Sequence, residues 1–186
     1  MQPIEMLMKE HGVIERMIRL TAREAEKIRY KNRVDVDFIH TAIDFIRNYA
    51  DKCHHGKEED ILFRDALKKP LSVGHRGLLE ELMSDHAFAR RTVAGLESAN
   101  NLYARGDHAA IADIEKGLNI LAEFYPRHIE KEDKHFFPES MTYFSMQEQK
   151  DMIEAFVKRD QALIHDLYLK VVEKAEASAS VSSVPS

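Results

Sequence analysis

Four segments with helical periodicity each carry a histidine in the apolar stripe that should face the core. The four residues are His11, His54, His86 and His128. Two of them are followed four residues later by a glutamate, since Glu58 comes after His54 and Glu132 comes after His128. Because residues i and i+4 share one face of a helix, each His/Glu pair can address a single point in space.

Burying these six polar groups is costly unless they have partners. A buried imidazole needs a hydrogen bond, and a buried carboxylate must be paired or bound to a cation. A salt-bridged polar layer is one solution, but a metal site is the simplest. Four imidazoles and two carboxylates are too many for one tetrahedral zinc, and the nitrogen content disfavours calcium and magnesium. Two cations that share the carboxylates use the whole set, as di-iron and di-manganese bundle proteins do.

Long helices must position these side chains. Apolar residues at helical spacing predict helices over residues 4–30, 36–67, 73–104 and 107–134, and glycine (7) and proline (5) are scarce. Long helices with short connections pack as antiparallel neighbours, so we predict an all-α fold, an up-down-up-down four-helix bundle. With alternating helix directions, the four histidines fall near the same end of the bundle and can converge.

We divide the chain into three parts. Residues 1–140 should form the metal-binding bundle, with Pro138 interrupting the helical pattern. Residues 141–176 should add a C-terminal helix that packs across the bundle or mediates self-association as a homodimer. Residues 177–186, rich in Ala, Ser and Val, are expected to lack regular structure.

Composition and charge restrict the class of protein. Lys and Arg number 27 and Asp and Glu number 32, which gives a net charge of −5. This balance argues against nucleic-acid and anionic-membrane partners, which require a basic face. No apolar run is long enough to span a bilayer, and no signal peptide is evident. A single cysteine, Cys53, rules out a disulfide framework and indicates a reducing compartment. We therefore expect a cytoplasmic protein.

The sequence resembles the haemerythrin-like family, also called the HHE cation-binding domain. Residues 53–63 and 128–138 both follow the family's His-x-x-x-Glu pattern with aromatic residues after it. His11 and His86 fit the two single-histidine positions. Order and spacing agree over roughly residues 5–140.

The resemblance implies two non-haem iron ions, which manganese or zinc could replace in a purified sample. Glu58 and Glu132 would bridge the metals, with His11, His54, His86 and His128 as terminal ligands. His55 is a further candidate, because some family members place a ligand directly after the first histidine of the second helix. On an α-helix it would point about 100° away from His54, toward the second metal or a supporting position.

The chain departs from the oxygen-carrying haemerythrins in its third helix. These carriers have a second histidine one turn along, but here Leu82 and Arg90 flank His86. Reversible oxygen transport is therefore disfavoured. Four further histidines share no common depth, so we interpret them as surface or incidental residues: His40, His75, His108 and His165. His135, two turns beyond His128, is expected to be a surface residue or to support a ligand, and the alternative is that it lines the mouth of the bundle.

The leading functional hypothesis is a di-iron protein that binds or senses oxygen, nitric oxide or peroxide, or handles iron. One alternative is an enzyme that turns over peroxide or nitric oxide, or donates iron for iron–sulfur repair. Another is a structural or interaction bundle without a functional metal. The sequence commits no additional general acid or nucleophile, which favours ligand binding over catalysis.

Overall fold

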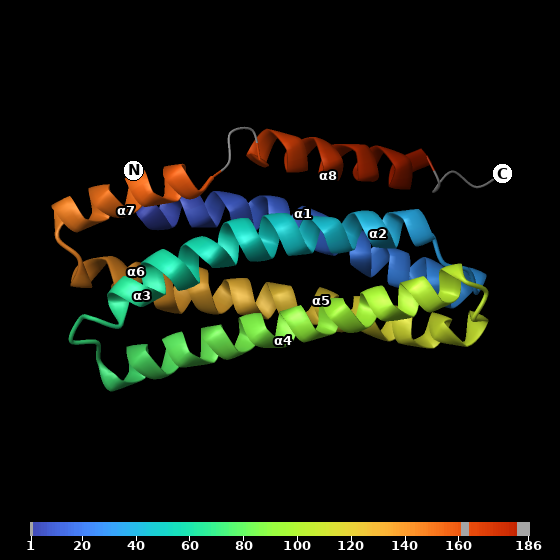
Figure 1. Cartoon of the computed structure of the whole chain (residues 1–186), viewed down its shortest axis with the longest axis horizontal. Helices are drawn as coiled ribbons and strands as arrows, with labels where there is room; N and C mark the ends of the chain where they lie inside the picture. The colour runs from blue at the N-terminus through green and yellow to red at the C-terminus, as the bar shows by residue number, and fades with distance from the viewer. Residues whose placement is uncertain (1, 161–163, 182–186) are drawn as a thin grey trace.

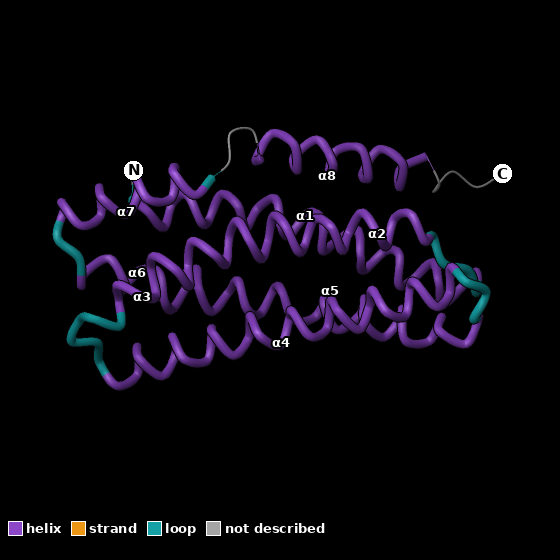
Figure 2. Tube along the Cα trace, viewed as in Figure 1, coloured by secondary structure: helices purple, strands orange, loops and turns teal. Residues whose placement is uncertain are grey.

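The computed structural model describes residues 2–160 and 164–181. Four long helical rods lie side by side, and two further helices, α7 and α8, run along one side of the bundle (Figure 1). The described residues contain helices and loops but no strands (Figure 2). The predicted all-α bundle is confirmed.

Each rod corresponds to one predicted helix. The first rod is α1 (Pro3–Lys31) and the third is α4 (Val73–Ala104). The second rod consists of α2 (Val36–Phe45), η1 (Ile46–His55), η2 (Glu58–Phe63) and α3 (Arg64–Ala66). The fourth consists of η3 (His108–Ala110), α5 (Ile111–Lys131), η4 (Glu132–Phe136), α6 (Phe137–Ser140) and η5 (Met141–Tyr143).

Local sequence signals begin and end these rods. The side chains of Asp35 and Ser72 accept hydrogen bonds from the backbone N–H groups of the first turns of α2 and α4. Gly106 follows α4 with a φ of 97°, a left-handed conformation that glycine adopts at little cost. The helical ends therefore follow from capping chemistry.

The second and fourth rods widen to π-helix where the two His/Glu motifs occur, in η1, η2 and η4. Pro138 does not end the fourth rod as expected, because it sits in the first turn of α6 directly after a π-helical segment. Proline has no backbone N–H to offer, and the first turn of a helix is where that loss matters least. The rod therefore continues to Tyr143.

Two apolar clusters fill the bundle. One cluster contains Ile14, Tyr49 and Leu121, and the other contains Leu7, Leu79 and Phe137. In the first three rods one cluster gives way to the other at the histidine, and in the fourth this happens between Ile129 and Phe136, at Glu132. A polar layer thus separates two halves of the core.

The C-terminal region forms two helices where we expected one. α7 (Met146–Arg159) begins with a capping box at Ser145 and ends at Asp160, whose backbone is extended. α8 (Ile164–Val181) follows. At the end of α7 the Asp160 side chain accepts hydrogen bonds from Lys57 and His165.

α8 also includes residues 177–181, which we expected to lack regular structure. The alanines of this stretch favour helix, and Ala179 packs against the core. Residues 182–186 of the predicted tail lie outside the described residues.

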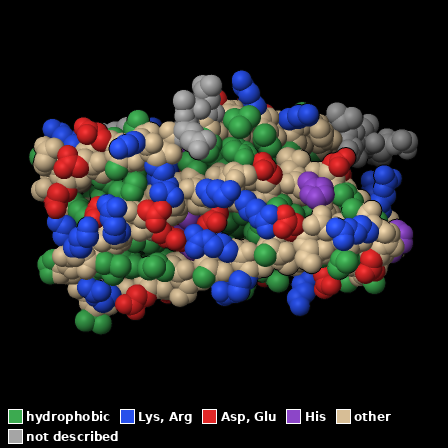
Figure 3. All heavy atoms as spheres, viewed as in Figure 1, with side chains coloured by type: hydrophobic (Ala, Val, Ile, Leu, Met, Phe, Trp, Pro, Cys, Tyr) green, Lys and Arg blue, Asp and Glu red, His purple; other side chains and the backbone are tan. Residues whose placement is uncertain are grey.

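The face of the molecule in Figure 3 carries no patch of a single charge sign. Basic and acidic side chains are interspersed on the side of the molecule seen in Figure 3. None of the helices in the described part of the chain is long and apolar enough to cross a membrane.

The C-terminal helices share the core of the bundle. Phe156 of α7 is fully buried in the cluster that contains Phe63 and Phe137, and Val172 of α8 is fully buried in the other cluster. The C-terminal region is therefore packed on the bundle through buried apolar side chains.

We expect Phe156→Ala to destabilise the whole protein by about 3–5 kcal/mol, the usual cost of removing a buried aromatic ring. Chemical denaturation followed by circular dichroism should show one transition at lower denaturant concentration. Val157→Ala, which truncates an exposed neighbour, is the matched control. A separate early transition in Phe156→Ala would show instead that α7 unfolds independently.

Candidate metal centre

The polar layer between the two clusters contains all seven residues predicted from the sequence. Each of them is at most 2% exposed, although all have ionisable side chains: His11, His54, His55, Glu58, His86, His128 and Glu132. They form two groups whose donor atoms lie within 4.8 Å of one another. One group is His11, His54, Glu58 and Glu132, and the other is His55, His86 and His128.

The two glutamates link these groups. Oε1 of Glu58 lies 3.4 Å from Nε2 of His54, and its Oε2 lies 3.4 Å from Nε2 of His86. Oε2 of Glu132 lies 3.2 Å from Nε2 of His11, and its Oε1 lies 3.3 Å from Nε2 of His128. Each carboxylate therefore presents one oxygen to each group of histidines.

These facing atoms have no hydrogen-bond partners. The unpartnered atoms are Nε2 of His11, His54, His86 and His128, and all four carboxylate oxygens of Glu58 and Glu132. Native proteins rarely leave buried polar atoms unsatisfied, because each such atom costs about 1–3 kcal/mol. Eight in one layer fit a site whose partners are cations.

The other nitrogen of each ring is held by a carboxylate from a neighbouring rod. Asp133 accepts from Nδ1 of His11 at 2.8 Å, and Glu10 accepts from Nδ1 of His54 at 2.9 Å. Because an ionised carboxylate can only accept, the hydrogen must reside on Nδ1. In a neutral ring, Nε2 then presents its lone pair to the centre of the layer.

The same arrangement occurs on the opposite side of the layer. Glu59 accepts from Nδ1 of His86 at 2.7 Å, and Asp85 accepts from Nδ1 of His128 at 3.2 Å. In each case the carboxylate belongs to one rod and the histidine to the next. The four hydrogen bonds form a closed ring: first rod to second, second to α4, α4 to fourth, and fourth back to first.

His55 joins the site because of the local helix geometry. On an α-helix, adjacent residues diverge by about 100°, yet both His54 and His55 are 1% exposed within the layer. They lie at the end of the π-helical η1, whose wider turns reduce the angle between neighbours. The His55 ring stacks on His86 with centroids 3.9 Å apart, and its Nδ1 donates to Asp51 at 3.3 Å.

Burial and charge set different protonation preferences within the layer. Burial lowers the pKa values of His54 and His55 well below 6.5, so both rings are neutral at neutral pH. Burial also disfavours charge on His11, but Asp133 and Glu132 outweigh it and raise the pKa of His11 to about 10. Burial and the nearby Glu132 raise the pKa of Glu58 well above its usual value. In the metal-free protein, protons therefore occupy part of the site.

A third cluster of residues whose types can ligate a metal already contains a cationic side chain. Glu10, Cys53, Asp160 and His165 lie within 4.8 Å of one another. The buried ammonium of Lys57 contacts Glu10 and lies 2.6 Å from Asp160. The Cys53 thiol donates to Asp160 at 3.3 Å, and burial raises its pKa to about 12, so it is not a reactive thiolate. This cluster is an internal ion-pair network.

The interpretation of His75 as a surface or incidental residue was wrong. The ring is 4% exposed, stacks on Phe136 with centroids 4.5 Å apart, and donates from Nε2 to the Phe136 carbonyl at 3.0 Å. The ring thereby satisfies the Phe136 carbonyl, a backbone acceptor in the π-helical part of the fourth rod. His135 and His40 are exposed, as expected.

Sequence reasoning missed the five supporting carboxylates. Four of them directly precede or follow a predicted ligand in the sequence: Glu10, Glu59, Asp85 and Asp133. The available signal was an acidic residue directly beside a predicted ligand, which occurs at His11, Glu58, His86 and Glu132. A residue adjacent to a core position points toward the next rod, so it could have been assigned there.

Comparison with known proteins identifies the family of the chain. The model of the haemerythrin HHE cation-binding domain matches residues 2–140, which include the entire polar layer and its ring of hydrogen bonds. Searches of curated proteins and of solved structures gave no significant match. The match covers most of the chain, and the chain therefore belongs to the haemerythrin HHE cation-binding family.

Proposed function

We propose that the protein is a non-haem di-iron protein that binds or senses oxygen, nitric oxide or peroxide, or handles iron. One observation carries the proposal: histidines oriented by carboxylates face two glutamates whose oxygens are buried and unpartnered. Carboxylate–histidine pairs of this kind are typical of metal sites, because the outer hydrogen bond fixes the ring and raises its basicity.

The donor set favours two cations over one. Two imidazoles and one oxygen from each glutamate form the first group, with His11 and His54. Three imidazoles and the other two oxygens form the second, with His55, His86 and His128. Nitrogen and oxygen donors without thiolate suit iron or manganese, and bundle proteins hold such pairs with ligands from facing helices. Iron would supply redox chemistry and an open coordination position for a small ligand.

The residues around the layer determine what can reach it. Ile14 and Leu82 are almost fully buried at its borders and keep bulk water away. The first group offers four donors and the second offers five. A metal on the His11–His54 side would therefore keep one more coordination position for an added ligand. The third helix, α4, has no second histidine, and His55 of the second rod supplies an imidazole to this side of the layer in its place.

The first test is metal stoichiometry with matched ligand variants. We expect about two irons per chain after anaerobic loading with ferrous iron, as in other carboxylate-bridged bundles. Glu58→Ala and Glu132→Ala should lose both, since each carboxylate contacts both groups. His11→Ala and His86→Ala should each retain about one. Glutamate variants that keep both irons, or a wild type that binds none, would contradict the proposal.

Metal removal should lower the stability of the fold. The layer has unpaired buried groups without a cation, and a ligand that binds only the native state adds about 2.7 kcal/mol at a concentration of 100 Kd. We expect the chelated protein to have a lower Tm than the loaded protein. His40→Ala, at an exposed histidine, should behave like wild type. Equal Tm values with and without metal would disprove the coupling.

Metal binding should also release protons. The pKa of His11 is about 10 in the metal-free protein, so its ring is protonated below that pH and the metal must displace the proton. Affinity should therefore rise with pH, by about tenfold per pH unit for each proton released. Calorimetry in buffers of different ionisation enthalpy measures the release. An affinity unchanged between about pH 6 and about pH 8 would contradict this assignment.

A further inference from the structure

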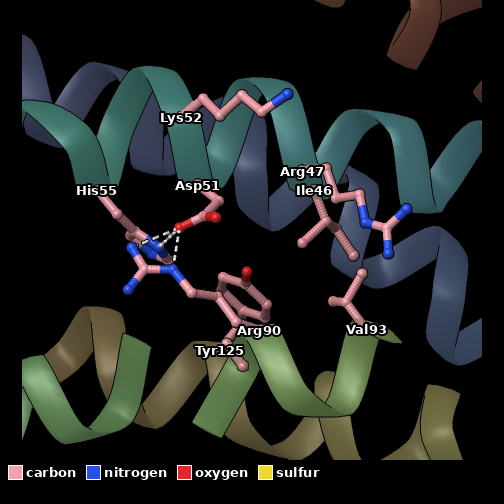
Figure 4. A pocket seen from close by; sticks show the side chains of 9 residues that line it. Ile46, Arg47, Asp51, Lys52, His55, Arg90, Val93 and Tyr125 are labelled. Carbon is pink, nitrogen blue, oxygen red and sulfur yellow. Dashed lines mark hydrogen bonds and ion pairs between the residues drawn. The ribbon is translucent and has the colours of Figure 1, made fainter. Parts of the chain in front are cut away.

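Arg90 of α4 contacts two carboxylates that support the polar layer. It lies one turn after His86. Its side chain is 41% exposed. With Asp51, His55 and Tyr125 it lines a pocket of about 380 Å³ between the second rod and α4 (Figure 4).

One guanidinium group holds two carboxylates. Nε of Arg90 donates to Oδ1 of Asp51 at 2.8 Å, and Nη2 donates to Oε1 of Glu59 at 2.7 Å. Nη2 is also 2.7 Å from Oδ1 of Asp51. Figure 4 shows the guanidinium and the His55 ring meeting at the Asp51 carboxylate.

Each of these carboxylates orients a different histidine of the same group. Asp51 accepts from Nδ1 of His55, and Glu59 accepts from Nδ1 of His86. Two other supporting carboxylates also contact a cation, but each of those cations serves one histidine only. Lys57 contacts Glu10 beside His54, and Lys131 contacts Asp85 beside His128.

The geometry points to Arg90 as the positioning residue for the His55–His86–His128 half of the centre. This inference rests on the proposed function, because it concerns how that half binds its metal. The planar guanidinium has donors directed along two edges, which an ammonium lacks. A single arginine can therefore fix two carboxylates, and through them two rings.

Loss of Arg90 should release both rings. Asp51 and Glu59 would then be two neighbouring negative charges without their shared cation, and like charges repel at this separation. Both side chains are partly exposed, at 24% and 22%. They can turn toward solvent, which removes the acceptors of His55 and His86.

The first experiment uses the whole 186-residue chain without metal. With ¹⁵N-labelled histidine, NMR should detect hydrogen-bonded Nδ1–H protons in the wild type. We expect Arg90→Ala to lose the signals of His55 and His86 and to keep that of His54. Arg91→Ala, which removes an exposed charge from the same helix, should keep them all. Unchanged His55 and His86 signals in Arg90→Ala would overturn the inference even if the protein binds two metals.

The second experiment loads the same variants with ferrous iron. Arg90→Ala should retain about one iron per chain and lose the spectrum of the coupled pair, as expected when one half of a two-metal site fails. Arg90→Lys, which can reach one carboxylate but not fork to two, should be intermediate. Methylguanidinium should enter the vacated pocket and restore loading in Arg90→Ala only.

These outcomes separate the two proposals. A wild type that takes up no metal contradicts the proposed function, whereas the NMR result still decides the role of Arg90. Two irons in Arg90→Ala, or equal effects of methylguanidinium on Arg90→Ala and Arg91→Ala, overturn the inference. If Arg90→Ala does not fold, Arg90→Lys is the deciding variant. Wild-type iron loading together with wild-type Nδ1–H signals of His55 and His86 in Arg90→Lys would overturn the inference.

Discussion

The ring of four histidine–carboxylate hydrogen bonds is the constraint on which the rest of the structure depends. Each bond joins neighbouring rods, from Glu10 to His54 and onward around the bundle until Asp133 returns to His11. A shift of one rod along its axis by a single turn, about 5.4 Å, would break two of these bonds. The ring therefore fixes the position of each rod along the bundle axis. It also directs Nε2 of each of the four histidines toward the centre of the layer.

This arrangement has a cost that the apolar core must offset. Eight buried atoms of the layer have no hydrogen-bond partner within the protein, and four of them are the carboxylate oxygens of Glu58 and Glu132. Apolar clusters above and below the layer, extended by Phe156 and Val172 from the C-terminal helices, supply the opposing stabilisation. Destabilised polar groups held in place by a stable scaffold are what a site ready to bind a ligand requires.

The C-terminal region is tied to the same constraint. Asp160 binds the ammonium of Lys57, and Lys57 in turn contacts Glu10, the member of the ring that orients His54. Arg159 reinforces this junction by donating to the carbonyl of Lys52. Gly56 gives the Arg159 guanidinium space to lie against the second rod. Helices α7 and α8 thus support the layer as well as covering the core.

The sequence by itself determined the four rods of the bundle, their order and the His/Glu residues at the centre of the layer. Periodicity, capping residues and the two His-x-x-x-Glu motifs each depend on neighbours a few positions away, so they can be interpreted without a structure. For the same reason the extent of α4 and the inward direction of His54 and Glu58 were predictable. The contact of Asp160 at the end of α7 was not predictable, because its partner Lys57 is remote in sequence.

Only the tertiary structure decided how the layer is supported. His55 enters it because the second rod widens to π-helix, a change that α-helical spacing does not predict. The pairing of each carboxylate with a histidine of the next rod depends on which rods are neighbours and at what height. Arg90 shows the same dependence, since its two carboxylates belong to another rod. Contacts between distant segments are set by packing, so the local sequence can mark an acidic neighbour of a ligand but cannot identify the side chain of another rod with which it pairs.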